Sequence, residues 1–171
     1  MPALAYFGRA QALAEEVVRS LAARKKKIAV AESCTAGLAS DFITRVPGAS
    51  NVFWGSFVTY TSDAKIKMLG VPEELIEAYG EVSRPVALAM AAGALEKSDA
   101  SWTFSVTGIA GPGGGSAGVP VGTIWVAVAG RDGDYSWSEA KKFFFVGGRN
   151  EVREAAAAIA LQELLERINR T

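Results

Sequence analysis

Hydrophobic positions follow a helical period in some segments of this chain and a strand pattern in others. Leu13, Val17, Val18 and Leu21 recur at three- to four-residue spacing, which predicts a helix over residues 3–24. Short apolar, β-branched or aromatic runs predict strands over 27–31, 52–60 and 102–107. Further helices are expected to open at 32–35 and to cover 62–69, 73–78 and a stretch capped by Ser83.

The last third of the chain has the pattern of a hairpin followed by a helix. Residues 121–129 and 136–146 are strand-like, and they flank the Asp132-Gly133 step of residues 131–134, which is typical of a tight turn. Apolar positions over 149–168 return to helical spacing. Helices before and after strands, with one hairpin, predict an α/β fold with a mixed sheet and helices on both faces.

Length and charge restrict the classes of protein that need to be considered. The chain has 171 residues, so we expect a single domain over 1–171. It has 18 Lys and Arg against 18 Asp and Glu, and this zero net charge argues against a nucleic-acid partner. No run reaches the ~18 apolar residues of a membrane span, and the lone Cys34 favours a reducing compartment, so we expect a cytoplasmic protein.

The absence of histidine is the most restrictive feature of the composition. It excludes Ser-His-Asp and Cys-His catalysis as well as every histidine-ligated metal site. A general base would have to be Lys, Asp, Glu, Tyr or a terminal amine. No metal-ligand cluster is apparent in the sequence, and we expect neither a metal nor a cofactor.

A glycine-rich loop, GIAGPGGGSAG, spans residues 108–118. Its last six residues match G-x-G-x-x-G, but a dinucleotide site needs a helix after the loop, and here a strand is expected to follow. The loop could be only a flexible connection. Because glycines let backbone N–H groups approach a ligand, a substrate-facing role is the alternative that we favour.

Two serine–lysine patterns and one isolated serine are candidates for a nucleophile. The pattern S-x-x-K occurs at Ser62–Lys65 and at Ser138–Lys141, and two matches in a short chain show how unspecific it is. Ser33 follows an apolar strand and is expected to open a helix, where free N–H groups could stabilise an oxyanion. From the residues alone, a simple N-cap is the favoured interpretation of Ser33, and Cys34 is better explained as a small buried apolar residue.

Several blocks of the chain together resemble the CinA C-terminal domain family. The sequence AESCTAG over 31–37 is similar to the family's AESCTGG motif, and GSFVTYTSDAK over 55–65 is similar to its G-F-V-T-Y-S-N-E-A-K segment. The sequence SVTGIAGPGGGS over 105–116 and the PVGT that begins at Pro120 match its longest signature. The blocks keep the family order from about residue 27 to about residue 160.

This resemblance implies a nicotinamide mononucleotide deamidase with a three-layer α/β/α fold, acting on a small-molecule substrate and forming a homodimer. It implies that Ser33 is the nucleophile, that Lys65 is its base, and that Tyr60 assists. A wider set of residues would bind the substrate: Ser50, Thr35, Thr107, Gly108, Gly111, Gly113 and Arg149.

The chain departs from the family pattern at a few positions, which leaves two alternatives open. Ala36 replaces a glycine, Ala49 replaces a serine, and residues 54–56 differ from the usual segment before F-V-T-Y. None of these changes removes a proposed catalytic group. They bear on substrate preference, so an amidase for another small substrate and a non-catalytic nucleotide-binding module remain alternatives to the deamidase.

Overall fold

The computed structural model describes residues 3–133 and 135–170, with side chains from Tyr6 onward, and shows an α/β architecture. Five strands form one sheet: β1 (Ile28–Glu32), β2 (Phe53–Val58), β3 (Trp102–Gly108), β4 (Thr123–Asp132) and β5 (Tyr135–Phe144). The helices are α1 (Ala3–Ala23), α2 (Leu38–Thr44), α3 (Ser62–Leu69), α4 (Glu73–Tyr79), α5 (Arg84–Glu96) and α6 (Arg149–Ile168), with a 3-10 turn η1 (Ala49–Asn51).

The sheet is mixed, with strand order β2-β1-β3-β4-β5. Strands β2, β1 and β3 run parallel, whereas β4 and β5 pair antiparallel as the predicted hairpin, and Asp134 of its turn lies outside the described residues. Parallel strands end at the same edge of a sheet. The segments that follow β1, β2 and β3 therefore meet at one edge, although they are far apart in sequence.

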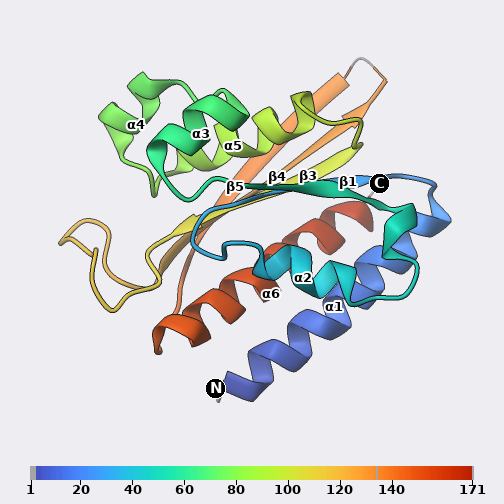
Figure 1. Cartoon of the computed structure of the whole chain (residues 1–171), viewed down its shortest axis with the longest axis horizontal. Coiled ribbons are helices and arrows are strands. Elements are labelled where there is room, and N and C mark those ends of the chain that lie inside the picture. The colour runs from blue at the N-terminus through green and yellow to red at the C-terminus, as the bar shows by residue number, and fades with distance from the viewer. Residues whose placement is uncertain (1–2, 134, 171) are drawn as a thin grey trace.

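Helices cover both faces of the sheet, as predicted (Figure 1). Helices α1, α2 and α6 form one layer, and α3, α4 and α5 form the other. The glycine-rich loop, gold in Figure 1, projects from the same end of the sheet as the start of α6. None of the helices in the described ranges combines the length and apolarity that a bilayer crossing requires.

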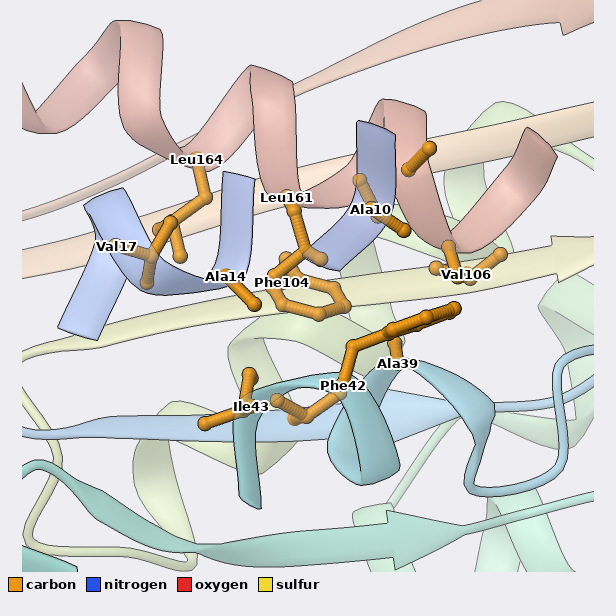
Figure 2. Packing of buried hydrophobic residues seen from close by; sticks show 14 of the residues in the cluster. Ala10, Ala14, Val17, Ala39, Phe42, Ile43, Phe104, Val106, Leu161 and Leu164 are labelled. Atoms are coloured by element: carbon orange, nitrogen blue, oxygen red, sulfur yellow. The ribbon is translucent and has the colours of Figure 1, made fainter. Parts of the chain in front are cut away.

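The larger apolar core lies between the sheet and the α1/α2/α6 layer. Phe42 of α2, Phe104 of β3 and Leu161 of α6 are fully buried there and pack together, as Figure 2 shows. Ala10 and Ala14 of α1 are also fully buried, and their small side chains let α1 approach α6 closely. Two smaller apolar clusters lie on the α3/α5 face, where residues of α5 pack against Ala31 of β1 and against Ala127 and Ala129 of β4.

One local prediction is wrong: no helix opens at Ser33. Glu32 is the last residue of β1, residues 33–37 form a turn, and α2 begins only at Leu38. Ala36 (φ 50°) and Gly37 (φ 94°) both adopt left-handed backbone conformations, which a right-handed helix cannot include. The expectation that Ser33 could be an N-cap fails for the same reason. The other elements lie within a few residues of their predicted positions, and Ser83 caps α5 by accepting a bond from the Val86 amide.

Candidate active site

The structure brings Ser33 and Lys65 together across 32 positions of sequence. Ser33 follows β1 directly, and Lys65 lies in α3, which covers the same end of the sheet. The Lys65 Nζ atom is 3.2 Å from the Ser33 Oγ atom, which is hydrogen-bond distance. The arrangement has the geometry that proton transfer between an amine and a hydroxyl group requires.

Lys65 is fully buried, which is unusual for a lysine side chain. Burial lowers the pKa of Lys65, because a charged ammonium is disfavoured away from water. The Glu81 carboxylate opposes this shift, with smaller opposing effects from Cys34 and Tyr60. Burial prevails, so the Lys65 amine is neutral at a lower pH than an ordinary lysine amine.

Glu81 lies in the turn between α4 and α5 and contacts Lys65 from the cavity side. Its Oε2 atom is 3.5 Å from Lys65 Nζ, and its Oε1 atom accepts a short hydrogen bond from the Ser62 hydroxyl. The Glu81 side chain is 42% exposed, so water still reaches the carboxylate. Ser62 of the first S-x-x-K pattern thus binds Glu81 rather than Lys65.

A cavity of about 420 Å³ opens beside Ser33. Its volume suits a small-molecule ligand. It is lined by several residues singled out in the sequence: Ser33, Tyr60, Thr107, Gly108, Gly111, Gly113 and Arg149. Glu81 and Cys34 also line it, and the glycine-rich loop forms one wall.

Arg149, the first residue of α6, links two walls of this cavity. Its guanidinium donates to the Gly111 carbonyl oxygen at 2.7 Å and to the Tyr60 hydroxyl at 2.9 Å. These bonds hold the glycine-rich loop and Tyr60 in fixed positions relative to α6. Arg149 and Tyr60 are both exposed, so their remaining polar atoms are accessible from the cavity.

The other three predicted substrate-binding side chains have different settings. Thr107 is buried in the cavity wall, and its hydroxyl donates to the Glu81 carbonyl oxygen at 2.9 Å. Thr35 is fully buried, is not part of the lining, and its hydroxyl has no hydrogen-bond partner among the described residues. Ser50 is exposed on η1 and is also not among the lining residues.

Two charged residues fix the turn that holds Ser33, and sequence reasoning did not identify either of them. The Glu32 carboxylate is fully buried and accepts hydrogen bonds from the amides of Gly37, Ala39 and Ser40. From α6, Arg153 donates to the carbonyl oxygens of the two residues after Ser33, at 3.1 and 2.8 Å. Glu32 could have been identified because it is a charged residue at the end of the otherwise apolar strand 28–32. Arg153 could have been identified because it lies four residues after Arg149, on the same face of a helix.

Cys34 is buried, as expected for a small apolar residue. Burial raises the pKa of its thiol to about 12, so the group stays protonated at neutral pH. A protonated thiol is a poor nucleophile. Ser33 is therefore the better candidate of the two neighbours.

The second S-x-x-K pattern lies outside this site. Ser138 and Lys141 belong to β5, an edge strand, and neither lines the cavity. Lys141 forms an ion pair with Glu163 of α6 at 2.6 Å. In the described part of the chain, no group of three or more His, Cys, Asp or Glu side chains is placed to hold a metal ion.

Fold and site together define an α/β domain with a buried lysine beside a serine at the edge of a mixed sheet. The family model for the CinA C-terminal domain matches residues 10–168. The chain therefore belongs to the CinA C-terminal domain family.

Relatives of known name agree with this family assignment. The chain is 45% identical to the nicotinamide-nucleotide amidohydrolase PncC of Shigella flexneri, over 89% of this chain and 90% of PncC. It is 47% identical to a CinA-like protein of Akkermansia muciniphila over 90% of its own length but only 36% of that relative. It thus spans little more than a third of such longer CinA-like proteins. Over most of both chains, it is a homologue of the amidohydrolase PncC.

Solved structures show the same fold. The competence/damage inducible protein CihA of Agrobacterium tumefaciens superposes with a TM-score of 0.87 at 42% identity, covering 94% of this chain and 96% of that one. A CinA superfamily protein of Escherichia coli gives a TM-score of 0.86 at 33% identity, covering 92% and 90%. The α/β/α arrangement is therefore that of crystallised members of the family.

Proposed function

We propose that this protein hydrolyses the carboxamide of nicotinamide mononucleotide, giving nicotinate mononucleotide and ammonia. The observation that supports this most directly is the 3.2 Å contact between the buried Lys65 amine and the Ser33 hydroxyl. The name of the PncC relative, which aligns over most of both chains, supports the choice of substrate. The lone cysteine is consistent with activity in a reducing cytoplasm.

In the proposed reaction, neutral Lys65 accepts the Ser33 hydroxyl proton while Ser33 Oγ attacks the carboxamide carbon. The cationic pyridinium ring of the substrate withdraws electrons and makes that carbon more electrophilic. The Lys65 ammonium then returns the proton to the departing nitrogen, and ammonia leaves an acyl-enzyme. Water, deprotonated in turn by Lys65, hydrolyses the ester and regenerates Ser33.

Stabilisation of the oxyanion is assigned to the turn after Ser33, because the start of α2 is already occupied. The Glu32 carboxylate accepts the first amides of that helix, so they do not serve a substrate anion. The Thr35 amide donates to none of the described groups, and Arg153 fixes the carbonyl oxygen of the same residue. Amides of this turn are suitable donors for the developing charge.

The substrate phosphate is assigned to Arg149 and the glycine-rich loop. Arg149 is at the first turn of α6, where the guanidinium and the positive end of the helix dipole act together on an anion. The backbone at Gly111 and Gly113 lines the same cavity as Arg149. The homodimer that the family resemblance implies stays a prediction, because the structure describes one chain.

The test is release of ammonia from nicotinamide mononucleotide by the purified protein without added metal. Ser33→Ala and Lys65→Ala should each reduce turnover by at least about a hundredfold, because each removes a group that takes part in bond making. Ser138→Ala and Lys67→Ala change exposed residues of the same types and should keep wild-type rates.

Full activity in both Ser33→Ala and Lys65→Ala would refute the assigned pair. Binding of the nucleotide by calorimetry without any ammonia would instead indicate a non-catalytic binding module. Turnover of another amide in a substrate panel, with none of the nucleotide, would indicate an amidase of different preference.

A further inference from the structure

Glu81 is the one acidic side chain that contacts Lys65 among the residues that the structure describes. No hydrogen bond joins Glu81 to Ser33, and Glu81 was not among the residues that the family resemblance singled out. Its two carboxylate oxygens have separate partners, with Oε2 on Lys65 and Oε1 on the Ser62 hydroxyl. The carboxylate is thus held on one side and directed at the amine on the other.

We propose that Glu81, anchored by Ser62, is a positioning residue that stabilises the Lys65 ammonium formed when Ser33 loses its proton. In this arrangement Lys65 lies between the nucleophile, Ser33, and the carboxylate of Glu81. This inference rests on the proposed function and adds a third participant to its serine–lysine pair.

The charge changes in the reaction explain why a carboxylate is useful at this position. Proton transfer converts a neutral amine into an ammonium inside a buried site, where an unpaired charge is costly. A carboxylate 3.5 Å away offsets part of that cost in the charged state and has little effect on the neutral amine. No proton is transferred to Glu81 in this scheme; the proton moves only between Ser33, Lys65 and the leaving nitrogen.

The geometry of Glu81 balances two opposing requirements on Lys65. A fully buried carboxylate would hold the lysine permanently as an ammonium, and the lysine could then not act as a base. The Glu81 side chain is 42% exposed, so water weakens its electrostatic attraction for the Lys65 ammonium, while the Lys65 side chain itself is fully buried. The ionisable groups that act on Lys65 are Glu81, Cys34 and Tyr60, and the effect of Glu81 is the largest of the three.

Ser62 and Thr107 hold Glu81 from both ends. The Ser62 hydroxyl, at the start of α3, binds the carboxylate, and the Thr107 hydroxyl donates to the Glu81 carbonyl oxygen. Lys65 lies one helical turn after Ser62 on α3, so a single helix carries both the amine and the anchor of its carboxylate. The positions of Ser33, Lys65 and Glu81 therefore depend on contacts among β1, α3, β3 and the turn before α5.

The test compares wild type with Glu81→Gln, which keeps the size of the side chain and removes its charge. The Lys65 signal in a carbon-13 NMR titration, assigned by its loss in Lys65→Met, should move to lower pH in Glu81→Gln. The turnover number for nicotinamide mononucleotide should fall about tenfold or more, with KM little changed. Ser62→Ala should change both quantities in the same direction and by less. Glu77→Gln, an exposed carboxylate on α4, should leave both unchanged.

An unchanged Lys65 titration in Glu81→Gln would overturn the proposal. So would a raised KM at constant turnover number, which would indicate that Glu81 binds the cationic ring of the substrate instead. The NMR titration needs no substrate. If wild-type protein released no ammonia from the nucleotide, the proposed function would fail while the role of Glu81 would still be decided.

Discussion

At the scale of single residues, the site depends on a lysine that the fold keeps away from water. Lys65 is fully buried, and burial lowers the pKa of its amine. The same burial that makes the amine a base at moderate pH should also cost folding stability, because the unfolded chain hydrates the ammonium freely. Activity and stability are therefore expected to oppose each other at this position.

We predict that Lys65→Met stabilises the fold while it abolishes turnover. At neutral pH the free energy of unfolding should rise by about 1 kcal/mol, because an apolar side chain of similar length replaces a buried amine. Denaturant unfolding, measured on both proteins across a range of pH, tests this prediction.

The pH dependence of that difference has a defined sign. The pKa of Lys65 is lower in the folded protein than in the unfolded chain. At a pH between these two pKa values the unfolded chain therefore binds more protons than the folded protein. The stability of the wild type rises with pH over this window. The wild type is least stable relative to Lys65→Met at a pH below the folded pKa of Lys65. This difference in stability vanishes near the ordinary lysine pKa of about 10.4. A Lys65→Met protein less stable than wild type at neutral pH would contradict this explanation.

Sequence reasoning reached some of these residues and missed others for physical reasons. Ser33 was a candidate from its place after an apolar strand, but its pairing with Lys65 came from the family resemblance, because the contact joins distant segments. Glu81 gave no signal, since its role depends on how the turn before α5 meets α3. Glu32, buried in an otherwise apolar strand, could have been recognised as a buried carboxylate.

At the scale of elements, the contact between α3 and α5 determines where Lys65 lies. A β-carbon added to Gly93 of α5 would lie 2.1 Å from the carbonyl oxygen of Leu69, the last residue of α3. Only glycine allows the two helices to come this close. Leu69 is four residues after Lys65, so any shift of this end of α3 is passed to the amine.

We predict that Gly93→Ala lowers both stability and activity. Forcing the helices apart should cost about 2 kcal/mol of unfolding free energy, the usual scale of an overpacked core. Displacing Lys65 from Ser33 should reduce turnover by about tenfold or more, because proton transfer depends steeply on distance. Thermal unfolding and ammonia release measure the two effects.

Gly8 of α1 provides the matched control. A β-carbon there meets no atom within 4 Å, so Gly8→Ala should keep full activity and gain up to about 1 kcal/mol from helix propensity. Wild-type stability and turnover in Gly93→Ala would show that the close approach of α3 and α5 does not position the lysine.

The elements were the best-predicted level of this structure. Apolar, β-branched or aromatic runs identified all five strands of the described sheet, and the helical spacing of apolar residues identified the long helices α1 and α6. The error at Ser33 arose from backbone conformation: Ala36 and Gly37 both have positive φ, and an alanine gives no sequence signal for that.

At the scale of the whole molecule, the site exists because three parallel strands end at one edge of the sheet. Ser33 follows β1, Tyr60 follows β2, and Thr107 is near the end of β3, so the order β2-β1-β3 places them side by side. Arg149 and Arg153 of α6 close the arrangement from the other layer. Loss of either layer would remove part of the site.

The layers and the mixed character of the sheet could be predicted from alternating helices and strands. The strand order could not, because it depends on pairings between segments such as 28–32 and 102–108 that carry no pairing signal in a single sequence. The cavity depends on this order, so its lining could be anticipated only through the family resemblance.

The pH dependence of kcat/KM for ammonia release tests most directly whether a neutral Lys65 activates Ser33. We predict a limb that rises with pH, because activity requires the deprotonated amine, and that is centred below the ordinary lysine pKa of about 10.4 because burial lowers the pKa of Lys65. A profile that does not rise with pH, or one whose limb is centred at the ordinary lysine value, would contradict the proposed base.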